Sequence, residues 1–133
     1  MITKKNINNI FLIFLITHLI IWVLAPTLSN PNLPLDTIEA LAWGSDLDWG
    51  YNKHPPMSAF VVEIFYLIFG NQDWAYYFLS QIFVLLAFFI IWRFSQDFFK
   101  NQISILFSVI VLELIYFYNY TTPEFNVYIC QLP

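Results

Sequence analysis

The sequence predicts an all-α integral membrane protein with about three transmembrane helices and one interfacial helix. Of its 133 residues, 59% are hydrophobic and only 11% are charged, whereas soluble domains carry about 25% charged residues. Apolar runs long enough to cross a bilayer core recur along the chain. Four of the nine acidic residues gather in one polar stretch, residues 34–56. A net charge of −4 argues against a nucleic acid partner, which requires a basic face.

The first predicted span covers residues 10–27 and follows two lysines, Lys4 and Lys5. It rises about 27 Å, which is enough to cross the bilayer core. A cleaved signal peptide also begins with basic residues. The apolar run is long for a signal peptide, and Ala-Pro-Thr is a poor cleavage site, so a retained anchor is favoured. His18 is expected to face a neighbouring helix rather than to bind a ligand.

Two further spans are predicted at 74–92 and 103–120. Segment 55–69 is helical in pattern but rises only about 22 Å, and it carries Glu63 near its middle. We therefore predict an interfacial helix on the outer face for segment 55–69.

The distribution of basic residues supports this topology. With three spans, four of the five basic residues lie on the cytoplasmic side, as the positive-inside rule requires: Lys4, Lys5, Arg93 and Lys100. The N-terminus is then cytoplasmic and residues 28–73 form an outer loop. A fourth crossing at 55–69 would move Arg93 and Lys100 outside.

The end of the chain is predicted to return to the outer face. Glu113 lies inside the third predicted span and should face protein or a cavity rather than lipid. Val127 is a candidate start for a fourth span. Three helices bury little core and leave faces that normally pack against further helices. We therefore expect a fragment, either a truncated gene or the front of a larger enzyme that is inactive by itself.

The acidic loop has two interpretations. Asp36 and Glu39 follow the spacing of a capping-box variant at a helix start, and the same pair of carboxylates suits proton transfer. Asp46 and Asp48 suggest a divalent metal, although two aspartates alone are a weak signal and solvated loop acids are favoured. No His or Cys cluster suggests zinc, so no cofactor is predicted. Cys130 stands alone, so there is no disulfide framework.

The order of motifs resembles the membrane glycosyltransferases of the GT-C superfamily. It runs from a first span through Asp-x-x-Glu, Trp-Gly and Gly-Tyr-x-Lys-His-Pro-Pro to a helix that ends in Phe-Gly. The most similar members are bacterial relatives of the dolichyl-phosphate-mannose protein mannosyltransferases and of the lipid A aminoarabinose transferases. The matching residues are Asp36, Glu39, Trp43, Gly44, Gly50, Tyr51, Lys53, His54, Pro55, Pro56, Phe69 and Gly70. The resemblance runs along the whole chain but covers only the opening part of a typical member.

The resemblance implies a reaction. The donor is a sugar on a polyprenyl phosphate, and the acceptor is a lipid, a glycan or a protein on the outer face of the membrane. The acceptor hydroxyl attacks C1 of the sugar and the lipid phosphate leaves, usually with inversion. This chemistry needs a carboxylate to take the proton and positive charge to hold the phosphate. The bacterial relatives imply the inner membrane as the location.

The resemblance also implies roles for individual residues. Asp36 matches the proposed base, and Glu39 could orient it or contact the acceptor. Lys53 matches a lysine that contacts the donor phosphate, although a snorkelling interface lysine stays open as an alternative. Tyr51 and His54 could add hydrogen bonds to the phosphate or the sugar, and a simple turn residue is an equal alternative for His54.

The tail is similar to the second outer loop of the family. It reads Thr122-Pro-Glu-Phe-Asn126 and then Gln131-Leu-Pro133. Glu124 lies where many relatives place an acid, often Asp, so it is a candidate second-loop acid. Two non-enzymatic classes also stay open: a small membrane subunit that joins a partner protein, and a transporter fragment with His18 and Glu113 on a polar path.

Overall fold

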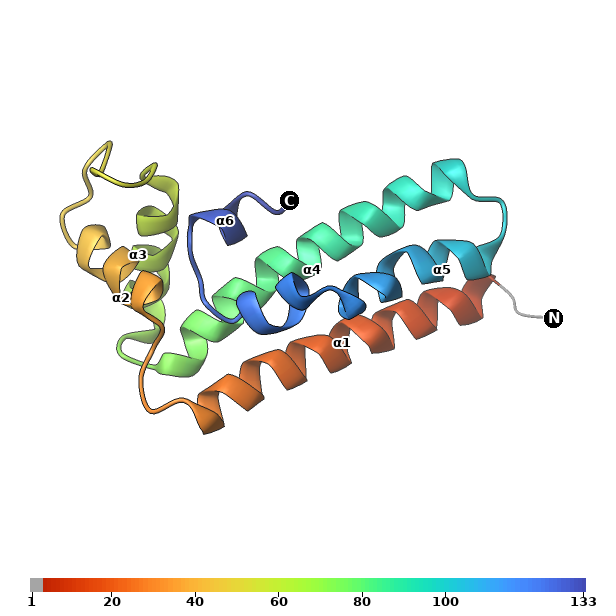
Figure 1. Cartoon of the computed structure of the whole chain (residues 1–133), viewed down its shortest axis with the longest axis horizontal. Coiled ribbons are helices and arrows are strands. Elements are labelled where there is room, and N and C mark those ends of the chain that lie inside the picture. The colour runs from red at the N-terminus through yellow and green to blue at the C-terminus, as the bar shows by residue number, and fades with distance from the viewer. Residues whose placement is uncertain (1–3) are drawn as a thin grey trace.

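The computed structural model describes residues 4–133, and within that range the chain forms helices and no strand (Figure 1). The all-α prediction is confirmed. In chain order the elements are α1 (Lys4–Ser29), α2 (Leu35–Gly44), α3 (Met57–Phe69), α4 (Asp73–Phe98), α5 (Gln102–Ile110), the 3₁₀ turn η1 (Val111–Leu114), the π turn η2 (Phe117–Thr121) and α6 (Val127–Cys130).

Two helices, α1 and α4, are long and apolar enough to cross a membrane. Each has 26 residues, which corresponds to about 39 Å at 1.5 Å per residue. They lie side by side with α5 (Figure 1), and the core between the three helices is apolar. The rings of Phe11 and Trp92 stack there with centroids 4.2 Å apart. The predicted spans 10–27 and 74–92 lie within these two helices.

The predicted third span, 103–120, is not one regular helix, and this is a correction. The α-helix ends at Ile110, and η1, an extended Ile115 and η2 follow. The physical reason is that polar side chains replace backbone bonds here. The side chain of Asn119 donates to the backbone carbonyl of Glu113, and the Glu113 carboxylate turns to the His18 ring of α1.

Helices α2 and α3 form a separate pair at the end of the bundle opposite the α4–α5 turn (Figure 1). Gly44 allows their close approach, because a Cβ there would lie 3.0 Å from the carbonyl oxygen of Ala59 and 3.1 Å from Cβ of Glu63. α3 starts after Pro56 and ends at Gly70, whose positive φ of 62° suits glycine. The helix predicted over 55–69 is therefore present.

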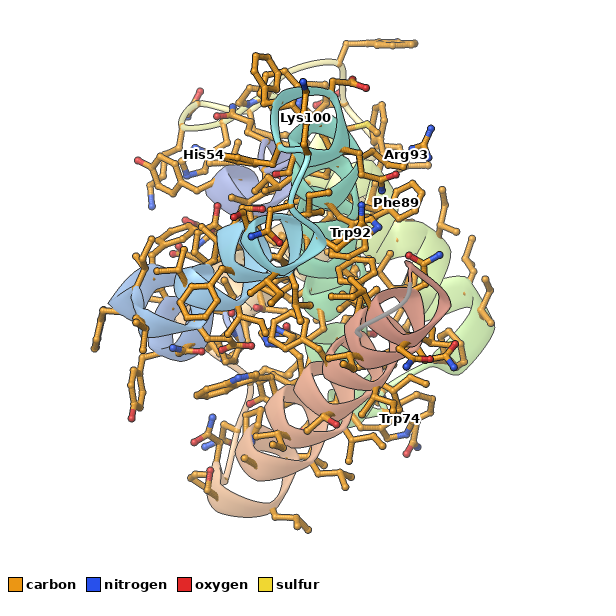
Figure 2. All side chains as sticks on the ribbon, turned by 90° about the vertical axis from the view of Figure 1, so that its right-hand side faces the viewer. His54, Trp74, Phe89, Trp92, Arg93 and Lys100 are labelled. Carbon is orange, nitrogen blue, oxygen red and sulfur yellow. The ribbon has the colours of Figure 1, made fainter. Side chains whose placement is uncertain are left out.

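The two ends of the bundle differ in charge. The start of α1 lies beside the α4–α5 turn (Figure 1). Arg93 and Lys100 lie toward the viewer in Figure 2, which looks onto that end, and the acidic loop 34–56 lies at the other end. This separation of charge is the arrangement that the positive-inside rule produces.

Cysteine labelling in intact cells tests the orientation. In a Cys130-free background, an impermeant thiol reagent should label Asp48→Cys and spare Asp97→Cys, because the α2–α3 end is predicted to face outward. Both positions are exposed, so access to the reagent depends on the side of the membrane. Labelling of both positions after the cells are opened is the control. The reverse pattern in intact cells would invert the topology.

Candidate functional site

The N-terminus of α2 meets the loop that follows η2, although the two lie 88 residues apart in sequence. Oε1 of Glu124 accepts the backbone N–H of Asp36 at 3.1 Å. The hydroxyl of Thr37 donates to the carbonyl of Phe125 at 3.2 Å, and the amide Nδ2 of Asn126 donates to Oδ2 of Asp36 at 3.4 Å. The two predicted outer loops therefore form one surface around the Asp36 carboxylate.

The capping-box interpretation of Asp36 and Glu39 is wrong. The residue before the first turn of α2 is Pro34, and no side chain of that segment caps the helix. Asp36 lies inside the first turn. Glu124 accepts one of the free N–H groups instead, and a carboxylate is favourable there because of the helix dipole. The carboxylates of Asp36 and Glu39 are left for other contacts.

Glu39 forms an ion pair with Lys53. Nζ of Lys53 donates to Oε1 of Glu39 at 2.7 Å, and the Lys53 side chain is 63% exposed while that of Glu39 is 28% exposed. The hydrogen bond and the charge of Glu39 raise the pKa of Lys53 above its ordinary value, and the charge of Asp36 adds to the effect. Lys53 is therefore a cation at every physiological pH, exposed and next to two carboxylates.

Tyr51 and His54 pack on Trp43. The Tyr51 ring stacks on the indole with centroids 5.2 Å apart, and the His54 ring meets its edge at 5.6 Å. The Tyr51 hydroxyl donates to the Trp43 carbonyl at 2.7 Å and accepts the backbone N–H of Asp48 at 3.1 Å. In this arrangement the two residues hold the shape of the loop that carries Lys53.

Two of the hollows at this end of the molecule are lined by the loop that follows α2. The first is open, polar and about 370 Å³ in volume, within the range of small-ligand pockets. It is lined by Glu39, Trp43, Asp48, Gly50, Tyr51, Asn52 and Lys53. The second, about 420 Å³, lies between the loop and α3 and is mainly apolar, lined by Leu47, Trp49, Phe60, Glu63, Ile64 and Leu67. A ligand with a charged head group and an apolar tail would suit these two hollows.

The acids suggested for a metal do not assemble with others. Across the part of the chain that the structure describes, no group of three or more His, Cys, Asp or Glu side chains could hold a metal ion. Asp46 and Asp48 both lie exposed in the loop after α2.

Asn126, which the sequence shows only as the end of a tail motif, has two roles in the structure. Its Oδ1 accepts the backbone N–H groups of Tyr128 and Ile129 at 3.0 and 3.2 Å, which makes it the N-cap of α6. An Asn before an apolar run is a recognisable cap signal. Its other role, the contact of its amide with Asp36, depends on the meeting of the two loops and has no local signal.

These features define a helical membrane protein with a charged, partly hollow site at one end of its spans. Residues 53–133 match the family model described as dolichyl-phosphate-mannose-protein mannosyltransferase. The chain therefore belongs to this family of glycosyltransferases, which use a sugar donor linked to a polyprenyl phosphate, and the resemblance to GT-C enzymes is confirmed. The match includes Lys53, Tyr128 and Glu124 but ends short of Asp36 and Glu39. No curated protein and no solved structure gave a match.

Proposed function

We propose that this chain works as part of an enzyme that transfers a sugar from a polyprenyl-phosphate donor to a lipid, glycan or protein acceptor on the outer face of the bacterial inner membrane, with its N-terminus in the cytoplasm. The observation that carries the proposal is the convergence of Asp36, Glu39, Lys53 and Glu124 at one end of the spans. Family membership supports the type of reaction. The geometry supports separate roles for Lys53, which binds phosphate, and Asp36, which accepts the proton.

Lys53 binds the donor phosphate in this proposal. Its ammonium is exposed in the polar hollow, and its raised pKa keeps it charged. A compact cation suits a phosphate oxygen. The isoprenyl chain of the donor would follow the apolar hollow beside α3. Tyr51 and His54 hold the loop, and their hydrogen bonds to phosphate or sugar remain a prediction.

Asp36 acts as the base. The acceptor oxygen forms a bond to C1 of the sugar, the bond from C1 to the phosphate oxygen breaks, and the acceptor proton passes to the Asp36 carboxylate. Polyprenyl phosphate leaves with the electron pair of the broken bond, next to Lys53. Asn126 holds one oxygen of Asp36, and Glu124 holds the helix that carries it. Glu39 balances the charge of Lys53 until the donor arrives.

A transfer assay in native membranes tests the proposal. A labelled polyprenyl-phosphate sugar should lose its sugar to membrane acceptors when the protein is present, and the loss should disappear from membranes of a deletion strain. Equal transfer in membranes with and without the gene would rule out the proposed activity.

Glu39→Gln should tighten the binding of an isoprenyl phosphate only a few-fold, because an exposed ion pair is weak and Glu39 competes with phosphate for Lys53. Titration of farnesyl phosphate into the protein in nanodiscs measures this. The loss of binding at high pH should also begin at a lower pH, because Glu39 no longer raises the pKa of Lys53.

The control for Glu39→Gln is the same change in a Lys53→Ala background. There the Glu39 substitution should have no effect on binding, since nothing is left to compete for. Weaker binding in Glu39→Gln alone would mean that Glu39 orients Lys53 toward the phosphate rather than competing with it.

A further inference from the structure

A buried polar cluster connects the spans inside the bundle. Nε2 of His18 in α1 lies 2.9 Å from Oε1 of Gln81 in α4, and Nδ1 of His18 bonds to Oε1 of Glu113 in η1. His18 is 3% exposed and Gln81 is fully buried. His18 faces a neighbouring helix, as predicted, and the Glu113 side chain, which is 24% exposed, lies against His18. Polar groups at this depth are costly unless they are hydrogen-bonded, and inside membrane spans they mark candidate functional sites.

The hydrogen-bond pattern assigns the hydrogens of the cluster. The Thr122 hydroxyl donates to the carbonyl of Tyr118 at 2.9 Å, so it accepts from Nε2 of Gln81 at 3.4 Å. Oε1 of Gln81 therefore faces His18 and can only accept, which puts a hydrogen on Nε2 of His18. Nδ1 of His18 faces the Glu113 carboxylate, so side chains alone link α1, α4 and η1 in this cluster.

The cluster continues to the candidate site. Thr122 accepts from Gln81 and its backbone carbonyl accepts the hydroxyl of Ser80, so α4 holds Thr122 at two atoms. The short segment 122–126 then leads to the side chain of Asn126, which donates to Asp36. Hydrogen bonds and the backbone of segment 122–126 thus connect α1, through α4, to the carboxylate proposed as the base.

The position of this segment depends on side chains because its backbone is irregular. Between Ile110 and Thr122 the chain passes through a 3₁₀ turn, an extended residue and a π turn. Such turns hold their geometry less firmly than an α-helix. The Glu113 carboxylate bonds the broken helix to His18 of α1, and within the broken helix the Asn119 side chain donates to the Glu113 carbonyl.

We propose that His18, Gln81 and Glu113 are positioning residues for the candidate site: they fasten the broken helix so that segment 122–126 meets the N-terminus of α2 and orients Asp36. The role of Asp36 rests on the proposed function. The structural part of the inference concerns only how α2 and the segment ending in α6 are held together, so it can be measured without any sugar transfer.

Pulsed EPR distances in lipid nanodiscs test the structural part. Spin labels are placed at Ala42→Cys in α2 and Tyr128→Cys in α6, both exposed, with Cys130→Ala in all samples. With the native cluster, the two labels should give one narrow distribution of distances. Glu113→Leu and Gln81→Leu should each broaden this distribution, because segment 122–126 is no longer held in place. Glu113→Gln should keep it narrow, since its amide can donate to Nδ1 of His18.

Two controls separate positioning from general loosening. Ser108→Ala removes another hydrogen bond between helices, that of Ser95 with Ser108 at 2.7 Å, and should leave the distance narrow. A second label pair, Ala42→Cys with Asn71→Cys, reports on the α2–α3 pair alone and should stay narrow in every variant. Broadening of both label pairs in Glu113→Leu and Gln81→Leu, or an unchanged α2–α6 distance in both, overturns the proposal.

Sugar transfer in native membranes gives the link to function. Glu113→Leu and Gln81→Leu should lower transfer roughly 10- to 100-fold, the effect of a small misplacement of a catalytic group, while farnesyl phosphate binding at Lys53 stays as it was. Glu113→Gln should restore transfer. If the native protein shows no transfer at all, the proposed function fails while the EPR result still decides the positioning claim.

Discussion

Asp36→Asn is expected to lower sugar transfer roughly 100-fold or more, because it removes the proton acceptor and keeps the shape of the side chain. The α2 start should be unaffected, since its N–H contact is with Glu124 and an Asn oxygen can still accept from Asn126. Binding of farnesyl phosphate should not fall, because Lys53 keeps its place and its partner Glu39. Transfer per protein molecule in native membranes, together with the binding titration, measures both.

The matched control is Asp46→Asn, the same change in an exposed aspartate outside the polar hollow. Transfer by this variant should stay near that of the native protein. Near-normal transfer by Asp36→Asn would instead show that Asp36 is not the base. The catalytic assignment would then move first to Glu39 and next to Glu124, the other carboxylates at this end of the bundle.

Lys53→Ala is expected to weaken farnesyl phosphate binding and to lower transfer, each roughly 10- to 100-fold, because it removes a charge-assisted hydrogen bond to the phosphate. The two should fall together, since the phosphate is charged in both the ground state and the transition state. The difference from the native protein should shrink at high salt, because Lys53 is largely exposed.

Two variants accompany this measurement. Lys53→Arg keeps the charge and should retain part of the binding. Lys100→Ala removes an exposed lysine from the opposite end of the bundle and should change neither quantity. Unchanged phosphate binding in Lys53→Ala would make Lys53 the snorkelling interface lysine that the sequence left open, and the phosphate site would have to lie elsewhere.

The sequence alone determined the class of the protein and its two long spans. The apolar runs that become α1 and α4 are local signals, because span length and composition do not depend on partners. The end of α3 at Gly70 and the polar character of loop 34–56 can also be predicted from local sequence. The inward orientation of His18 and Glu113 could be predicted because a polar group inside a membrane has few other stable places.

Only the tertiary structure decided how the site is assembled. The local pattern of residues 103–120 indicates a regular helix, yet Glu113 finds His18 in another helix and the chain breaks there. Likewise, Glu124 meets the backbone of Asp36 across 88 residues. Such contacts are set by the packing of α2, α4 and the broken segment. Hydrophobic periodicity reports which side of a helix is buried, but it carries no information about which distant polar group will lie opposite.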